Sequence, residues 1–265
     1  MGWRWRRYWY GCFSLAWHPP ADFPVNYRLD LSYDGSDFFG YAIQPDLRTI
    51  QGDLEEALAK VLGSIATHVA GRTDAGVHAH HQVVSVTTER ETSPGVLQRA
   101  LNRMLGPEIV VSSLSEVDES FHARYSAVSR TYRYFILNRQ LPDPFLARTR
   151  WHYRYPLDLA PMNAAMGLLL GERDFSSFCR VAEGKSPIRS VEKAEWGREG
   201  EEVVLEITAN SFCHQMVRSL VRECVELGRG NGEPQDIVEI ADARDRNLAR
   251  GVAPARGLFL WQVNY

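Results

Sequence analysis

The sequence has few of the features that mark secreted, membrane-spanning or nucleotide-binding proteins. Its 265 residues include four cysteines, which form no C-x-x-C pair and so suggest neither a disulfide framework nor a cysteine zinc site. No run of about 18 apolar residues is present, so no membrane-spanning helix is expected. A G-x-x-x-x-G-K phosphate cradle and a dinucleotide fingerprint are also missing. We therefore expect a protein of the reducing cytoplasm.

What is present is ordinary for a globular chain, with 45% hydrophobic and 24% charged residues and a net charge of -3. The charge is unevenly distributed, because the segment 99–154 holds nine arginines against five acidic residues. His122 and Tyr125 lie among these cations. This concentration of positive charge fits a local RNA-binding groove, although a solvated arginine-rich face would show the same pattern.

The first 24 residues mix arginines with tryptophans and tyrosines. Their apolar stretch is short and broken, and it lacks the small-residue cleavage site of a signal peptide. We interpret residues 1–24 as a flexible extension or the product of a start codon placed too early. Deletion of residues 1–22 is expected to leave activity intact.

Hydrophobic periodicity predicts strands alternating with helices. Strands are expected at 25–33, 82–88, 128–138, 203–207 and 258–264, and helices at 50–62, 94–105, 158–171 and 216–225. The order of elements predicts an α/β (α+β) fold of two related lobes, 25–118 and 126–265, joined near 115–127.

The most informative stretch is the loop Gly71-Arg72-Thr73-Asp74-Ala75-Gly76-Val77-His78-Ala79, which precedes the strand at 82–88. It combines two glycines, a cation, a carboxylate and an imidazole. Glycines allow tight turning or close approach to a ligand. Taken alone, the loop is better explained as a tight turn in which Asp74 accepts backbone N–H bonds, because aspartate is common in turns.

This loop resembles the signature of the TruA family of tRNA pseudouridine synthases. Other segments resemble family motifs in the same order, over about residues 25–265. They are Tyr33-Asp34-Gly35-Ser36 with Phe39-Gly40, Gln51-Gly52-Asp53-Leu54-Glu55, Ala100-Leu101-Asn102, Phe121-His122-Ala123-Arg124-Tyr125-Ser126-Ala127, Arg130-Thr131-Tyr132-Arg133-Tyr134, Asp174-Phe175-Ser176-Ser177-Phe178, Met216-Val217-Arg218 and Ala255-Arg256-Gly257-Leu258.

The resemblance implies a pseudouridine synthase fold, with mixed, antiparallel-rich sheets and a central catalytic cleft. It implies isomerisation of uridine to pseudouridine in the anticodon arm of tRNA, at uridines 38 to 40, without a cofactor or metal. It further implies a homodimer with the tRNA arm lying across both subunits. Asp74 would be the nucleophile, attacking either the base or the sugar.

The resemblance also assigns roles to residues whose spacing alone suggests simpler ones. Arg218 would pair with Asp74 from the C-terminal half, although its spacing fits a helix-surface salt bridge. Tyr132 would contact the extruded uracil and Leu258 would pack against it, although both also fit a core position. Arg72 would displace the target base, although it could be solvated or paired with Asp74.

His78, Arg124 and Arg130 are further candidates for contact with the substrate.

Three positions depart from the family pattern. Tyr41-Ala42-Ile43-Gln44 stands where an aromatic-glutamine pair is usual, Arg222 replaces a glycine, and Cys213-His214 replaces a more apolar pair. These departures concern substrate contacts and local packing more than the reaction.

Two other functions are compatible with parts of the sequence. His78, His80 and Asp74 could be ligands of a metal-dependent hydrolase, since His78 and His80 would share one face of a strand. A non-catalytic RNA-binding protein would need the arginines but not Asp74.

Overall fold

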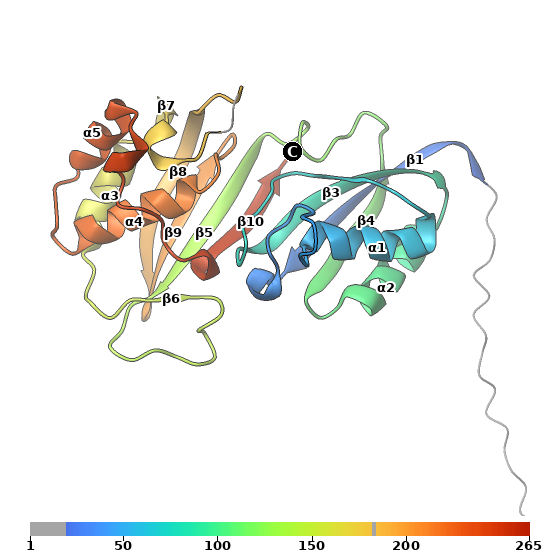
Figure 1. The fold of residues 1–265 in the computed structure, drawn as a ribbon, viewed down its shortest axis with the longest axis horizontal. Helices are drawn as coiled ribbons and strands as arrows, with labels where there is room; N and C mark the ends of the chain where they lie inside the picture. Colours follow the sequence, from blue (N-terminus) through green and yellow to red (C-terminus); the bar gives the residue numbers. More distant parts are fainter. Residues whose placement is uncertain (1–19, 182–183) are drawn as a thin grey trace, which may run out of the picture.

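The computed structural model describes residues 20–181 and 184–265 of the chain, which form ten strands and five α-helices (Figure 1). The strands are β1 (Pro20–Tyr33), β2 (Thr67–Val69), β3 (His78–Arg90), β4 (Ile109–Val117), β5 (Ser129–Leu137), β6 (Trp151–His152), β7 (Gly171–Asp174), β8 (Ile188–Glu199), β9 (Glu202–Ala209) and β10 (Leu258–Asn264). The α-helices are α1 (Ile50–Leu62), α2 (Pro94–Leu105), α3 (Leu159–Gly167), α4 (Met216–Gly228) and α5 (Asp236–Ala243). Short 3-10 helices are η1 (Gly35–Asp37), η2 (Ser176–Phe178), η3 (Arg246–Leu248) and η4 (Ala255–Gly257).

All ten strands belong to one sheet, whose main path runs β4-β1-β3-β10-β5-β9-β8-β7. Neighbouring strands are antiparallel, except that β10 runs parallel to β3 and β6 runs parallel to β5. The expected mixed, antiparallel-rich architecture is therefore confirmed. The two halves share this one sheet, because β10, the last strand, lies between β3 of the first half and β5 of the second (Figure 1).

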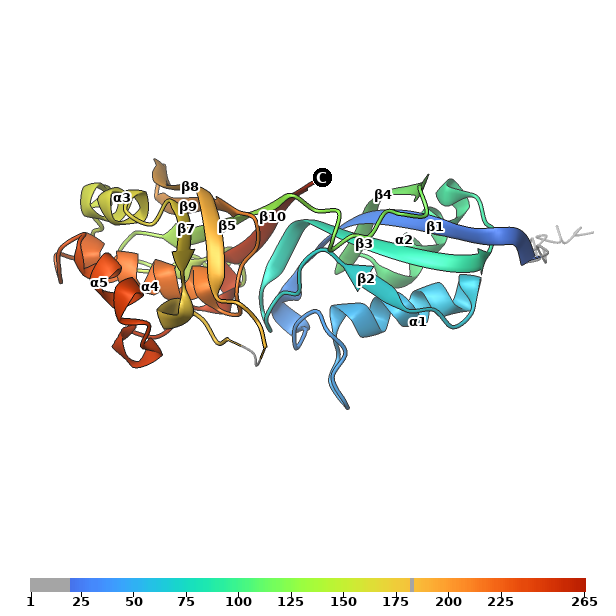
Figure 2. The same ribbon diagram turned by 90° about the horizontal axis from the view of Figure 1, so that it is seen from above.

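Helices cover the sheet at both ends (Figures 1 and 2). The first half carries α1 and α2, and the second half carries α3, α4 and α5. Helix α1 begins after Thr49, whose hydroxyl accepts the Gly52 N–H, and ends at Leu62, before Gly63, whose φ is 83°. The helices of each half thus pack on the strands of the same half, which is the arrangement that two lobes would have.

Helices α1 and α2 and strand β10 match the expected ranges, because their hydrophobic spacing and end signals are local. Strand β9 and helix α4 extend one to three residues beyond their expected ranges, and four other elements differ in bounds or burial. β1 begins at Pro20, so residues 20–24 are part of the fold rather than of an extension, whereas residues 1–19 lie outside the described part. β3 begins at His78 rather than at 82, and α3 ends at Gly167 rather than at 171.

The fourth difference concerns β5, which does not alternate between a buried and an exposed face. Eight of its nine residues are buried, because it is a central strand flanked by β10 and β9. Within the described residues, no helix is both long and apolar enough to cross a membrane.

Candidate active site

The segment 70–77 connects β2 to β3 and ends where the two halves of the sheet meet. β3 pairs with β10 through only two residue pairs, His78 with Phe259 and Leu260 with Ala79. Asp74 therefore lies at the junction of the halves, next to the start of β10. The sheet places this loop within reach of side chains from both halves.

A network of buried polar side chains holds the loop that contains Asp74. The Tyr33 hydroxyl lies 2.8 Å from the Thr73 hydroxyl. Gln82, which is fully buried, donates from Nε2 to the Gly71 carbonyl at 2.7 Å and to the Tyr33 hydroxyl at 3.2 Å. Buried polar groups are costly unless they are paired, so these bonds favour one loop conformation.

The turn after β1 holds the other side of the loop. Tyr41 donates its N–H to the Thr73 carbonyl at 3.0 Å, and Gly76 donates to the Phe38 carbonyl at 3.3 Å. Gly40 has φ of 96°, and a Cβ there would lie 3.0 Å from the Thr73 carbonyl oxygen. The glycine is therefore required by both its backbone conformation and its close packing on the loop.

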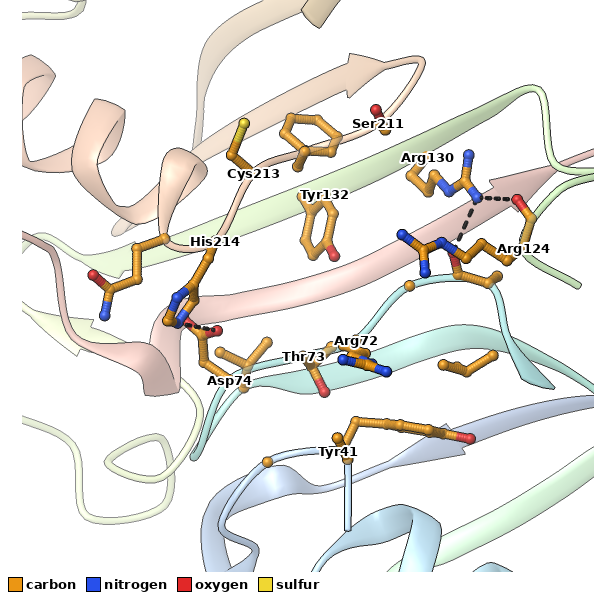
Figure 3. Close-up of a pocket in the computed structure, with 18 of the residues that line it drawn as sticks. Tyr41, Arg72, Thr73, Asp74, Arg124, Arg130, Tyr132, Ser211, Cys213 and His214 are labelled. Atoms are coloured by element: carbon orange, nitrogen blue, oxygen red, sulfur yellow. Dashed lines mark hydrogen bonds and ion pairs between the residues drawn. The ribbon is translucent and has the colours of Figure 1, made fainter. Parts of the chain in front are cut away.

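Asp74 is held by two cationic or potentially cationic side chains from the second half. Arg218 Nη1 lies 3.0 Å from Oδ2 of Asp74, and His214 Nε2 lies 3.2 Å from Oδ1 (Figure 3). The Asp74 side chain retains 23% of its exposure. The two contacts engage both oxygens of the carboxylate and orient it, and a carboxylate is a side chain that can act as a nucleophile.

Arg218 is itself oriented by the backbone. Its Nε donates to the Ala253 carbonyl at 2.7 Å, and its own carbonyl accepts the Ala253 N–H at 2.9 Å. It also lies in the first turn of α4, so the carboxylate is close to the positive end of the helix dipole. The expected pairing of Arg218 with Asp74 is thus present in the structure, across 144 residues of sequence.

Tyr132 and Leu258 complete the apolar wall beside the carboxylate. Tyr132 lies on β5 with its ring packed edge-to-face on Phe212, 5.0 Å between centroids, and its hydroxyl directed toward the loop (Figure 3). Burial, with the nearby Tyr33 and Asp74, raises the pKa of Tyr132, so the phenol keeps its proton. Leu258 is the first residue of β10 and lines the same wall.

These groups lie in a cleft of about 1180 Å³ whose charged lining is almost entirely cationic. Among the described residues, one carboxylate, that of Asp74, lines the cleft together with five arginines. The arginines are Arg72, Arg124, Arg130, Arg180 and Arg218. A positively charged groove of this kind attracts a polyanion.

The arginines of the cleft differ in their exposure and in the hydrogen bonds that hold them. Arg72 and Arg124 are exposed, and no ion pair joins Arg72 to Asp74 within the described residues. Arg130 is 8% exposed, and its guanidinium donates to the carbonyls of four residues. They are Ala70, Arg124, Ala127 and Asn210. Arg130 lines the cleft, but its guanidinium is occupied in joining the backbone of several segments. Its expected contact with substrate is therefore not favoured.

The arginine-rich segment 99–154 is not itself the groove. Of its nine arginines, only Arg124 and Arg130 line the cleft. Others pair with acidic side chains, among them Arg133 with Glu206 and Arg150 with Glu202. The charge count of the segment could not reveal these ion pairs, because the acidic partners lie far away in the sequence.

The expected role of His78 in substrate contact is wrong for this structure. His78 is 1% exposed, and its ring stacks on Phe259 at 4.5 Å between centroids. Phe259 follows Leu258 on β10 and therefore faces the opposite side of the sheet from the cleft. Nδ1 of His78 accepts the Gly35 N–H at 3.1 Å, and Nε2 lies 3.2 Å from the Arg256 carbonyl oxygen.

The structure also argues against a metal-dependent hydrolase, because the three expected ligands are engaged in other contacts. His78 and His80 stack on Phe259 and Trp261 respectively, while the Asp74 oxygens are engaged by Arg218 and His214. Across residues 20–181 and 184–265, no group of three His, Cys, Asp or Glu side chains is placed to hold a metal ion.

His214 is a site residue that the sequence reasoning missed. It appeared only as a departure from the family pattern, although it precedes Arg218 by four positions. The Arg180 N–H donates to its carbonyl at 3.1 Å, which fixes the loop before α4. Arg222, the other departure in this region, pairs with Glu226 one helical turn away and is not tightly packed.

Comparison with known proteins agrees with this geometry. The family described as tRNA pseudouridine synthase matches residues 31–126 and 165–265. The chain belongs to this family. The matched segments contain Asp74, Arg218 and Leu258, whereas Tyr132 lies between them.

Individual family members cover nearly the whole chain. The tRNA pseudouridine synthase A of Leifsonia xyli subsp. xyli is 42% identical over 92% of this chain and 93% of its own. The protein of the same name from a Geobacillus strain is 41% identical, over 90% of this chain and 97% of its own. That of Photorhabdus laumondii is 41% identical, over 89% and 90%.

Proposed function

We propose that this protein is an isomerase that converts uridine to pseudouridine in the anticodon stem-loop of tRNA, at positions 38 to 40, with Asp74 as nucleophile. The observation that carries this proposal is the Asp74 carboxylate, the one carboxylate that lines the cleft in the part of the chain that the structure describes, which is paired with Arg218 and surrounded by arginines. Family membership supports the reaction, and the charge of the cleft supports an RNA substrate.

The reaction breaks the N1–C1′ bond of uridine and forms a C5–C1′ bond. C5 loses a proton and N1 gains one, so the conversion is an isomerisation that needs no redox partner. The Asp74 carboxylate attacks C1′ of the sugar or C6 of the base, and either path keeps the uracil bound while it rotates. Arg218 pairs with the carboxylate and holds it in the cleft.

The remaining side chains would bind the flipped nucleotide. Tyr132 and Leu258 form an apolar wall on which a uracil can stack, and the protonated Tyr132 hydroxyl can donate a hydrogen bond. Arg72 is exposed beside Asp74 and would fill the space that the flipped base leaves. Arg124 would contact a phosphate at the cleft rim.

We further propose that two copies of the chain form a dimer across which the tRNA arm lies, and that the protein acts in the cytoplasm, where tRNA is modified. Sedimentation equilibrium tests the dimer, and a mass of two chains is the expected result. A monomer that modifies tRNA at full rate would contradict the shared binding of the arm.

The first experiment is tritium release from tRNA carrying uridine labelled at C5. Wild-type protein should release tritium, and Asp74→Asn should not, although it should still bind tRNA. Asp242→Asn is the matched control, because Asp242 is an exposed carboxylate paired with Arg173 away from the cleft.

Absence of release by wild type on every anticodon-arm substrate would contradict the proposal. Full biological activity of Asp74→Asn would instead favour the non-catalytic RNA-binding alternative.

A further inference from the structure

Formation of pseudouridine requires a group that accepts the C5 proton. After the uracil has rotated and C5 has joined C1′, C5 carries both a hydrogen and the new bond, and the aromatic base is restored only when that hydrogen leaves as a proton. The acceptor must lie next to C5. In either path, C5 is bonded to the atom that Asp74 attacks, which is C1′ in one path and C6 in the other. The acceptor must therefore lie beside the Asp74 carboxylate.

His214 lies there. Its Nε2 is 3.2 Å from Asp74 Oδ1, on the oxygen that Arg218 does not hold (Figure 3). Half of its side chain is exposed, at 50%, so the ring can exchange protons with solvent. Imidazole is the side chain whose basicity is best suited to proton transfer near neutral pH.

The other titratable groups of the cleft are less suitable. Tyr132 keeps its proton because burial raises its pKa, so it cannot accept another. Cys213 directs its sulfur away from Asp74, toward the Pro187 carbonyl (Figure 3). His68 and His122 pack against each other with tilted rings, 4.6 Å between centroids, and His122 also packs at a tilt against Tyr125.

We propose that His214 is the catalytic base that removes the C5 proton, an inference that rests on the proposed function. In the free protein, a protonated His214 forms an ion pair with the Asp74 carboxylate, in which Nε2 lies 3.2 Å from Oδ1. Once Asp74 bonds to the substrate, its oxygens carry less charge and this ion pair weakens. The Nε2 proton is then released to solvent, so that the Nε2 lone pair can take the C5 proton, which is passed on to solvent, while N1 takes up a proton.

The base role and a purely positioning role predict different isotope effects. A single-turnover assay would compare tRNA carrying uridine with protium or deuterium at C5, using wild type and His214→Gln. His80→Gln is the matched control, since His80 stacks on Trp261 outside the cleft. His214→Gln should be slower by about 10² or more, with a C5 isotope effect clearly larger than that of wild type.

A second substrate isolates the step. In 5-fluorouridine the C5 proton is replaced by fluorine, which cannot leave as a cation, so turnover stops after C5 joins C1′. His214→Gln should break the N1–C1′ bond of this analogue at the wild-type rate. A variant that is slow on both substrates without a larger isotope effect, or one that keeps full activity, would overturn the base role.

The two proposals fail in different ways. If wild type forms no pseudouridine, the proposed function is wrong and the isotope comparison has no product to follow. If wild type forms pseudouridine and Asp74→Asn does not, the function holds and His214 is judged by its isotope effect alone. The half-exposed position of His214 favours normal folding of the variant, which circular dichroism would verify.

Discussion

Arg218 binds Asp74 and the backbone at the same time, since its Nη1 lies 3.0 Å from the Asp74 carboxylate while its Nε donates to the Ala253 carbonyl. The arginine is thus fixed at both ends of its guanidinium. A carboxylate held by such a group is oriented as well as ionised. The relationship joins the loop before β3 to the first turn of α4, and the activity should depend on it.

Replacement of Arg218 by glutamine should lower kcat by on the order of 10² or more, because Asp74 loses its cationic partner. Arg218→Lys should recover only part of the rate, since a lysine keeps the charge but cannot make the Ala253 bond in the same geometry. Steady-state kinetics of tritium release measures both. Arg222→Gln, on the same helix and paired only with Glu226, is the control and should remain near wild type. A rise in KM alone would mean that Arg218 binds RNA rather than orienting Asp74.

Gly40→Ala should destabilise the protein and slow the reaction. The substitution combines a left-handed backbone with a contact of 3.0 Å to the Thr73 carbonyl oxygen, and strain of this kind costs about 1–3 kcal/mol. Gly171→Ala is a matched control, because Gly171 has φ of 87° but open space around its Cβ position. Urea unfolding should show a loss in both variants, whereas kcat should fall only in Gly40→Ala. An equal kcat in Gly40→Ala and Gly171→Ala would show that the activity tolerates displacement of the loop that contains Asp74.

Tyr33→Phe should cost about 1–3 kcal/mol of unfolding free energy, because the buried Thr73 hydroxyl and the Gln82 amide lose a partner. It should also lower kcat, since Thr73 is next to Asp74. Tyr27→Phe provides the comparison. Its hydroxyl bonds the backbone of Thr92, far from the loop, so its loss should affect stability but not kcat. A Tyr33→Phe variant with unchanged kcat would mean that the network stabilises the fold without positioning the loop.

His78 should make stability depend on pH. Burial lowers the pKa of its imidazole, and the nearby Asp34 carboxylate opposes this effect without outweighing it. The unfolded chain therefore takes up the proton first, at about pH 6.5. The contribution of neutral His78 is fully present above that value and is lost as the pH falls through the lower folded-state pKa.

Urea unfolding at pH 7.5 and pH 5.5 would measure this dependence. His78→Gln should reduce the decrease in unfolding free energy between the two values, whereas His80→Gln should leave it unchanged. An identical decrease in wild type and His78→Gln would assign the acid sensitivity to other groups.

Local patterns in the sequence were sufficient for several elements. The apolar spacing and end signals of α1 and α2 set those helices to the residue, because a helix depends on neighbours three and four positions away and on its caps. The loop containing Asp74 was identified by its glycines and charged groups, and its resemblance to family members pointed to Arg218, Tyr132 and Leu258. The structure brings these residues to one cleft.

Only the tertiary structure decided which side chains face Asp74. His78 seemed suited to the site by its place in the motif, yet the pairing of β3 with β10 turns it to the opposite side of the sheet. His214, which no local pattern singled out, is carried to the carboxylate by the start of α4. Strand pairing and helix packing join residues more than a hundred positions apart, and the side of the sheet that a residue faces changes with a single step of register. The sequence by itself therefore determined α1, α2, the loop and the chemistry available in it, whereas the partners of Asp74 were settled by long-range packing.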